Sequence, residues 1–567
     1  MPIHTANGFV GIDRRRKADK ALNVAHDMRN IRITAGGSLE KRAKTKLLCS
    51  LTGEIEGLWC GSLCDITFLL ASANGRLYKI DSSGNAREIG VIGGGACLFF
   101  EFCGRVYIMN SAYYGSYDGS TLTEIEGYIP LVAVGCLPNG EGTPYEEINM
   151  LTDKRRQRFS PDGKSILYKL AEEDIDEIVS VTVGGAVYNG NYSLNRQTSE
   201  LSFEQAIPAG LDSLEITYKK QSTTRKNILN CKRAMLFGGN SDGRIFLYCN
   251  PEKPNCRFYS ALADGVPSAE YFPVNCYTVI GSSPISCIVQ QYDRQLIFTK
   301  NEAFYSYCEL ITDNSGRRIS SFPVFSLNNG KGCLFETDGC VIANRPVTLC
   351  GDGLNMWEST GVENEKNALP FSQPINDLLA TSLLQGESLH LADLQSESEL
   401  FFIANGNAFV YNYGIGCWYI YDGFGGKGFK VYRDTLYFTN GSGIYCYSER
   451  GEANYVGIWQ SNYIVDEGGN LDIVSLCSDI RVKGNIRLKF IFETANGAIS
   501  EKGVELSEES EKYMRISLRP ALKRALPFRL SIHIEGEGEL TLHSLTVKTR
   551  KKERSRRIGL LQREAKA

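Results

Sequence analysis

The sequence lacks several features that would assign it to a common class of protein. Of its 567 residues only five are histidine and 17 are proline. No stretch reaches the ~18 to 20 apolar residues that a membrane-spanning helix needs. The first twenty residues, MPIHTANGFVGIDRRRKADK, hold no apolar core of the kind found in secretory signals. We therefore expect a chain that is made and folded in a cytoplasm and has no membrane segment.

The sequence also lacks a marked excess of one charge. Its 62 basic and 65 acidic residues give a formal net charge of -3. A protein coated in positive charge for duplex DNA would be strongly basic, so this balance argues against one. Any contact with nucleic acid must therefore be confined to local basic zones.

Metal-binding patterns are missing as well. None of the five histidines lies in HExxH or HxH spacing, and the closest cysteine pair, Cys60 and Cys64 in WCGSLC, is spaced CxxxC rather than CxxC. Most of the 18 cysteines sit in apolar strand-like runs such as ACLFFEF and PISCIVQQ, which predicts buried thiols rather than a disulfide framework. We predict no metal and no cofactor.

Three matches to catalytic motifs fail in their context. GNSDG (239–243) fits GxSxG, but the strand-like RIFLYC follows it where the motif needs a helix. GFGGKG (423–428) lies between two strands, so no helix N-terminus can hold a pyrophosphate. SPDGKS (160–165) resembles an Asp-box turn but lacks the closing Trp and is not repeated. We expect no enzyme, although two carboxylates brought together from distant loops, as in glycosidases, would leave no motif.

The abundant residues point to an all-β fold. The chain has 57 glycines, 29 tyrosines and 26 phenylalanines, the mix of short strands joined by tight turns. A polar turn followed by an aromatic-centred strand recurs, as in NGRLYKID (74–81), CGRVYIMN (103–110), DGRIFLYC (242–249) and RDTLYFTN (433–440). Hairpins repeated from about residue 50 to 450 without alternating helices favour a β-propeller, with six or seven blades.

Two stretches depart from this repeat and divide the chain. One contains short strands such as VSVTV and LEITYKK, and the other, near the end, has longer alternating strands typical of a β-sandwich. We predict an N-terminal arm and hairpin (1–49), a first set of blades (50–144), an inserted small β domain (145–222), a second set of blades (223–454), a C-terminal β-sandwich-like region (455–549) and a basic tail (550–567).

Basic residues gather in five zones along the chain, and three of them carry our hypothesis, the first in the hairpin HDMRNIRITAGGSLEKRAKTKLL (26–48). A solvated surface would explain any one zone, but a ring of copies would present each many times, and each phosphate neutralised strengthens DNA binding. Our hypothesis is that the first two zones face a DNA channel or an acidic partner ring and that the third is a basic arm. The zones are Arg29, Arg32, Lys41 and Arg42; Lys154, Arg155, Arg156 and Arg158; and Arg550, Lys551, Lys552, Arg554, Arg556 and Arg557.

The layout resembles the tail-hub, or packaged-DNA stabilisation, β-propeller proteins of short-tailed bacteriophages, which are nozzle-like head-completion proteins. The resembling segments are MRNIRITAGGSLEKR, EEINMLTDKRRQRFSPDGKSILYKL and RVKGNIRLKFIFETANG. The resemblance implies a homohexameric ring below the portal and adaptor proteins that extends the DNA channel, retains packaged double-stranded DNA and anchors tail fibres or spikes. It also implies a virion tail location after assembly in the host bacterial cytoplasm.

Two alternatives from other functional classes stay open. One is a carbohydrate-binding or carbohydrate-active β-propeller, which would gather acidic and aromatic residues on one face. The other is a monomeric propeller that acts as an interaction scaffold, which would not associate with a portal ring.

Overall fold

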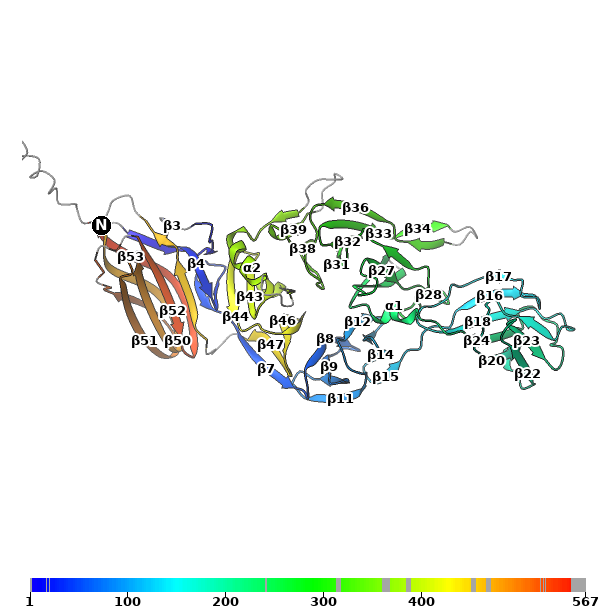
Figure 1. The fold of residues 1–567 in the computed structure, drawn as a ribbon. Helices are drawn as coiled ribbons and strands as arrows, with labels where there is room; N and C mark the ends of the chain where they lie inside the picture. Colours follow the sequence, from blue (N-terminus) through cyan, green and yellow to red (C-terminus); the bar gives the residue numbers. More distant parts are fainter. Residues whose placement is uncertain are drawn as a thin grey trace, which may run out of the picture. The chain divides into compact units, whose positions relative to one another are not determined.

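The computed structural model describes residues 3–16, 18–19, 21–239, 242–312, 318–358, 368–383, 389–449, 455–465, 471–520, 522–523, 525 and 527–551. These residues form an all-β chain in which the only α-helices are the short α1 (Arg225–Leu229) and α2 (Asn376–Leu383) (Figure 1). The chain divides into two compact units. Unit 1 holds the described residues of Met1–Leu51, Gly339–Ser359 and Lys366–Ala567, and unit 2 holds those of Thr52–Asp338.

Unit 2 contains four antiparallel sheets of four strands each, the form of a propeller blade. The strands of the first two sheets are β8 (Ile55–Leu63), β9 (Ile66–Ala73), β10 (Arg76–Ile80) and β11 (Ala86–Val91), then β12 (Leu98–Phe102), β13 (Arg105–Met109), β14 (Tyr114–Tyr117) and β15 (Leu122–Glu124). Those of the other two are β25 (Arg233–Gly239), β26 (Asp242–Tyr248), β27 (Cys256–Tyr259) and β30 (Tyr277–Val279), then β31 (Ile285–Gln291), β32 (Arg294–Thr299), β33 (Glu302–Tyr307) and β36 (Val324–Asn329).

The repeated turn pattern has a backbone cause. In the two-residue turns Asn74–Gly75 and Cys103–Gly104 both residues have positive φ, at 49° and 72° and at 48° and 71°. Two positive φ angles are typical of a type I′ turn, whose twist matches the right-handed twist of the strands on either side. This turn favours asparagine and glycine. The NG and CG dipeptides that mark the repeats are therefore the turns between neighbouring strands of one blade.

Neighbouring sheets of unit 2 share apolar side chains. Trp59 and Phe68 of the first sheet cluster with Ile108 and Tyr117 of the second. The second sheet meets the third through a cluster that includes Tyr107 and Phe258, and Tyr248 of the third packs with Ile297 of the fourth. Since one face of each blade is covered by the next, aromatic and aliphatic residues can occupy both faces of the inner strands.

The inserted β domain lies between β15 and β25 and begins earlier than predicted. Its larger sheet includes β16 (Leu131–Cys136) and β17 (Thr143–Pro144), both before residue 145. Strand β16 pairs in parallel with β18 (Lys154–Phe159), and parallel strands are not joined by a hairpin turn. The sequence therefore has no turn signal that would show that β16 belongs to the inserted domain. The other strands are β24 (Leu214–Lys219), β20 (Glu177–Val183) and β21 (Ala186–Val187), with a second sheet of β19 (Leu167–Lys169), β23 (Glu200–Phe203) and β22 (Tyr192–Asn195).

Unit 1 contains three more groups of four blade-like strands. The last of them is completed by β7, which comes from the beginning of the chain and pairs with β47. The described residues thus hold seven such groups, the larger of the two blade numbers expected. The strands are β37 (Cys340–Ile342), β38 (Arg345–Cys350), β39 (Gly353–Trp357) and β40 (Ala368–Pro370); β41 (His390–Leu394), β42 (Glu399–Ala404), β43 (Asn407–Asn412) and β44 (Cys417–Asp422); and β45 (Lys427–Tyr432), β46 (Thr435–Asn440), β47 (Gly443–Glu449) and β7 (Lys44–Ser50).

The C-terminal β-sandwich-like region is also part of unit 1, and its strands pair with strands from the beginning of the chain. Its strands are β48 (Gly457–Ser461), β49 (Tyr463–Ile464), β50 (Leu471–Thr494), β51 (Ile499–Leu518), β52 (Phe528–Glu535) and β53 (Gly538–Lys551). They are joined by β1 (Ile3–Asn7), β4 (Val24–Arg29), β5 (Ile31–Ile33) and β6 (Leu39–Lys41).

These pairings correct two predicted boundaries. The first 49 residues are not a separate arm, because β1 and β6 pair with β53 and β4 pairs with β48. Strand β53 runs to Lys551, so Arg550 and Lys551 belong to the sheet and not to the tail. Strand pairing between the two ends of a chain leaves no local trace in the sequence.

Candidate functional site

The first basic zone lies where β4, β5 and β6 meet the sheet β41–β44, within unit 1. Strand β4 joins that sheet through the pairing of Arg29 with Ile420. Arg29 Nε donates to Asp27 Oδ2 at 3.0 Å, and its Nη1 donates to Asp422 Oδ1 at 3.2 Å. The Arg29 guanidinium is therefore neutralised by carboxylates of the same chain.

Arg32 faces a buried carboxylate. Its Nη1 lies 2.8 Å from Glu397 Oε2 and 3.8 Å from Glu399 Oε1, and the Arg32 side chain is 11% exposed. Glu399 is fully buried, and its Oε1 accepts a hydrogen bond from the Tyr419 hydroxyl at 2.6 Å. Burial raises the pKa of Glu399 to about 7, against the attraction of Arg32 and the hydrogen bond from Tyr419. Arg32 thus compensates a charge in the interior of unit 1.

Lys41 and Arg42 are buried, which contradicts their predicted place on a DNA-lining or partner-contacting surface. Lys41 Nζ donates to the Gly536 carbonyl at 2.7 Å, and burial lowers the pKa of Lys41 to about 8. Arg42 Nε donates to Asn30 Oδ1 at 2.9 Å, and its guanidinium lies 4.1 Å from the centroid of the Tyr455 ring. A ligand could contact a cation held in this way only if the fold around that cation opened.

The second basic zone lies on β18, where side chains alternate between two faces. Arg155 is 4% exposed and pairs with Glu172 at 2.5 Å, so its predicted surface role is wrong as well. Lys154, Arg156 and Arg158 lie on the opposite face of the strand and are partly exposed. Lys154 pairs with Glu126 at 2.5 Å, Arg158 pairs with Glu215 at 2.7 Å, and Arg156 Nε donates to the Ile129 carbonyl at 3.0 Å. For these three, contact with DNA or a partner stays a prediction.

The third basic zone is only partly within the described residues. Arg550 lies on β53 with its Nη2 3.8 Å from Asp472 Oδ2, and Lys551 is the last residue of that strand. The other predicted members, Lys552, Arg554, Arg556 and Arg557, lie outside the described residues. Their role as a basic arm stays a prediction.

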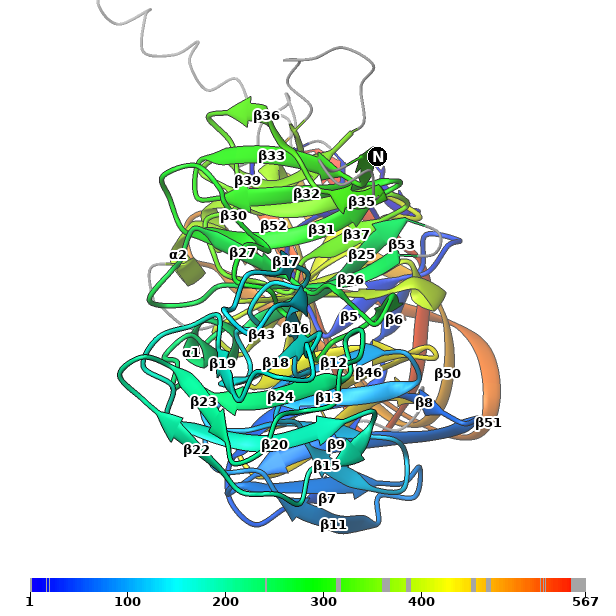
Figure 2. The ribbon, with the colours of Figure 1, turned by 90° about the vertical axis from the view of Figure 1, so that its right-hand side faces the viewer.

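Sequence reasoning missed the long strand β51, most of whose residues are exposed or half-buried. Figures 1 and 2 show it beside β50. It pairs with β50 along one edge, and among the described strands none pairs with its other edge. Ile499 and Tyr513 are 66% and 68% exposed. The strand also carries Glu501, Glu505, Glu508, Glu509 and Glu511. The alternation in VELSEESEKYMRISL would have indicated a strand, but nothing local indicates that it forms an edge.

The described residues show no other recognisable chemical centre. No cluster of three or more His, Cys, Asp or Glu side chains among them is arranged to hold a metal ion. No helix in the same part of the chain has the length and apolar character to cross a membrane. Ser241 of the GNSDG match lies outside the described residues.

Comparison with known proteins gives no family. No protein-family model matches the chain, and no curated protein matches it. Among solved structures, an exo-β-1,3-galactanase from Phanerochaete chrysosporium is 9% identical, with 81% of this chain and 97% of that chain covered, at a TM-score of 0.17. BBS1N in complex with ARL6DN is 9% identical, with 73% and 98% covered, at a TM-score of 0.28. A gluconolactonase from Xanthomonas campestris is 10% identical, with 62% and 97% covered, at a TM-score of 0.18. These low scores bear on neither activity nor ligand.

Proposed function

We propose that this protein is a structural component of a bacteriophage virion, a tail hub that forms a ring of about six copies below the portal and adaptor. In this role it extends the DNA channel, helps to retain the packaged DNA and offers an outer surface for fibres or spikes. The sequence resemblance motivates the proposal. The observation that supports it best is β51, a strand of 20 residues with one edge that no described strand pairs with.

A long exposed edge strand needs a partner or a device that keeps other strands away. Strand β51 has charged side chains along its length, and Lys512 pairs with Glu508 at 2.9 Å while Arg515 pairs with Asp479 at 2.6 Å. These charges discourage indiscriminate strand pairing but leave a large surface open to a complementary partner. A neighbouring copy of the chain in a ring meets that description, because every copy then covers the same surface of the next.

The location of the basic residues limits which of them can contact DNA in the proposed ring. Lys41, Arg42 and Arg155 are buried, and Arg29 and Arg32 are paired with carboxylates. On β18, Lys154 and Arg158 are likewise paired with carboxylates, whereas Arg156 donates to the Ile129 carbonyl. In the proposed ring the contact with DNA or with an acidic partner therefore falls to Arg156 and to the basic arm. Such contacts are non-specific and weaken as salt increases.

The test is the mass of the full-length protein in solution, measured by native mass spectrometry alone and after mixing with the portal and adaptor proteins encoded beside it. We expect a species of about six copies in at least one of the two conditions. A protein that stays monomeric in both would overturn the proposal and favour the monomeric scaffold.

A charge-reversal pair locates the contact within the ring. Glu501→Lys with Glu505→Lys changes exposed positions of β51, and we expect it to weaken ring formation ~10-fold or more, because each reversal replaces an attraction by a repulsion of about 1 kcal/mol. The matched control is Glu101→Lys with Glu309→Lys, which changes two exposed glutamates of unit 2 and should leave the ring intact. Equal effects of the two pairs would contradict the assignment of the contact to β51.

A further inference from the structure

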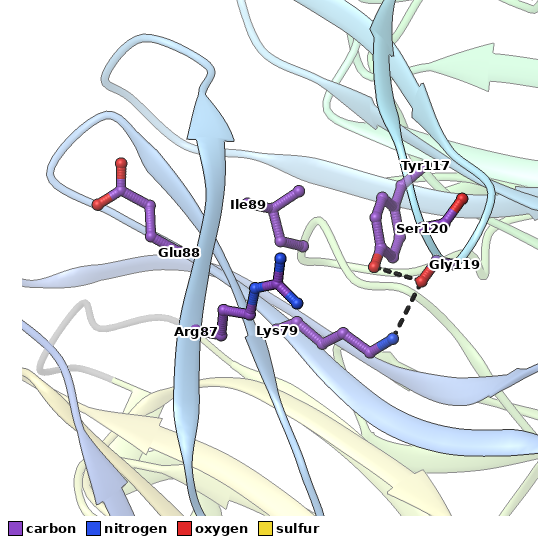
Figure 3. Close-up of a pocket in the computed structure, with 7 residues that line it drawn as sticks. All are labelled: Lys79, Arg87, Glu88, Ile89, Tyr117, Gly119 and Ser120. Atoms are coloured by element: carbon purple, nitrogen blue, oxygen red, sulfur yellow. Dashed lines mark hydrogen bonds between the residues drawn. The ribbon is translucent and has the colours of Figure 1, made fainter.

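A cavity in unit 2 has the composition of a binding site for a negatively charged small molecule. It has a volume of about 390 Å³ and lies between the hairpin β10–β11 and the turn that follows β14 (Figure 3). This volume lies within the range of natural ligand pockets. Its lining residues are Lys79, Arg87, Glu88, Ile89, Tyr117, Gly119 and Ser120.

Two of these residues are cations placed directly opposite each other. Lys79 on β10 and Arg87 on β11 are register partners in the antiparallel ladder. Like charges in that arrangement destabilise a sheet unless an anion lies between them or beside them. Figure 3 shows the two side chains next to each other in the cavity.

Neither cation is neutralised by a carboxylate of the described chain. Lys79 Nζ donates to the Gly119 carbonyl at 3.1 Å and lies 4.2 Å from the centroid of the Phe68 ring. The Arg87 side chain is exposed, and its guanidinium forms no hydrogen bond or ion pair with any residue that the structure describes, although the Arg87 backbone belongs to the β10–β11 ladder. Glu88 points away from Arg87 and pairs instead with Arg76 at 2.5 Å (Figure 3).

The carboxylate of Asp118, in the neighbouring turn, already accepts hydrogen bonds within that turn. Asp118 Oδ1 accepts hydrogen bonds from the backbone N–H groups of Thr121 and Ser120 at 2.7 and 2.8 Å. These bonds lower the pKa of Asp118 to about 2 and keep its carboxylate in the turn. The lining itself holds two cations, Lys79 and Arg87, and one carboxylate, Glu88, which is paired with Arg76, so it carries an excess of positive charge.

The remaining lining groups suit a polar molecule with an apolar side. The Tyr117 hydroxyl donates to the Gly119 carbonyl at 2.5 Å, the Ser120 hydroxyl donates to Asp118 Oδ1 at 2.8 Å, and Ile89 supplies an apolar wall. Arginine recognises a carboxylate or a phosphate with two parallel hydrogen bonds, and lysine adds a point charge. We infer that this cavity binds an oxyanion group, a carboxylate or a phosphate, carried by a sugar-sized polar molecule. The inference is independent of the proposed ring.

The experiment is calorimetric titration of the full-length protein with D-glucuronate, glucose 6-phosphate and neutral D-glucose. We expect at least one anionic sugar to bind and D-glucose to bind ~10-fold or more weakly, because a charge-assisted hydrogen bond would be lost. Stronger binding of glucuronate identifies a carboxylate ligand, and stronger binding of the phosphate ester identifies a phosphorylated one. Either result supports the site.

The matched variants are Arg87→Gln and Lys300→Gln. Both positions are exposed in unit 2, and Lys300 lies outside the cavity. We expect Arg87→Gln to weaken binding of the anionic sugar ~10- to 100-fold and Lys300→Gln to leave it unchanged. We also expect Arg87→Gln to raise the melting temperature of the ligand-free protein, because it removes the opposed pair of cations.

Three results would overturn the inference. They are failure of both anionic sugars to bind, binding of neither anionic sugar more tightly than glucose, and equal binding of the anionic sugar to the wild type and to Arg87→Gln. Since Arg87 is exposed, loss of folding is not expected to obscure the last comparison.

Discussion

Glu399 should make the stability of unit 1 fall as pH rises from 4.5 to about 7. Burial raises the pKa of this carboxyl from 4.5 to about 7, which corresponds to about 3 kcal/mol. Between pH 4.5 and pH 7 the folded chain keeps a proton on Glu399 that the unfolded chain has released. The free energy of unfolding therefore decreases across this window and levels off above it. The variant Glu399→Gln is uncharged at every pH and should not show this decrease.

Hydrogen exchange measured by mass spectrometry gives the local readout. Peptides covering β42 and β44 report the free energy of opening around Glu399, at pH 5 and at pH 8. We expect the stability difference between wild type and Glu399→Gln to change by about 3 kcal/mol between the two pH values. Glu397→Gln is the comparison variant: it removes a partly exposed carboxylate that helps to raise the pKa of Glu399, so the decrease of stability with pH should become smaller but persist. Parallel pH profiles for wild type and Glu399→Gln would refute the reasoning.

Two further substitutions test the interior and the turns. Arg42→Met removes the hydrogen bonds to Asn30 Oδ1 and to the Asp422 carbonyl and should destabilise unit 1 by about 3 kcal/mol. The measurement is the melting temperature, which should fall; an unchanged value would show that these bonds contribute little. Gly75→Ala places a side chain at a φ of 72° and should cost about 1 kcal/mol in the same assay, whereas a gain in stability would contradict the turn assignment.

The blade hairpins were predictable because their signal is local. A two-residue turn such as Asn74–Gly75 fixes the register of the strands on either side, and both members of each pair lie within about ten residues. The same reasoning fails for β16, whose parallel partner follows a long connection, and for β1, whose partner β53 is at the other end of the chain. Non-local pairing has no equivalent of a turn motif.

The candidate site was less predictable than the fold. The sequence showed where basic residues gather, but one of the two carboxylate partners of Arg29, Asp422, lies 393 positions away. The alternation of β18 also places Arg155 inside and Arg156 outside, although both belong to one run of basic residues. The cavity at Lys79 and Arg87 gave no motif, because two cations on neighbouring strands become a pair only through the register of the sheet.

The cations of the first basic zone and those of the cavity in unit 2 show how a cation that stabilises the fold differs from one that can bind a ligand. Arg32 and Arg42 are surrounded by carboxylate, carbonyl and aromatic groups that compensate their burial, so a ligand has nothing to add. Lys79 is compensated in part by the Gly119 carbonyl and the Phe68 ring, whereas the Arg87 guanidinium opposite it has no carboxylate partner among the described residues. An anion beside Arg87 would therefore lower the free energy of the folded chain by relieving the repulsion between the two cations. Uncompensated charge in a cavity, rather than the density of charge along the sequence, is therefore the better guide to where this protein binds.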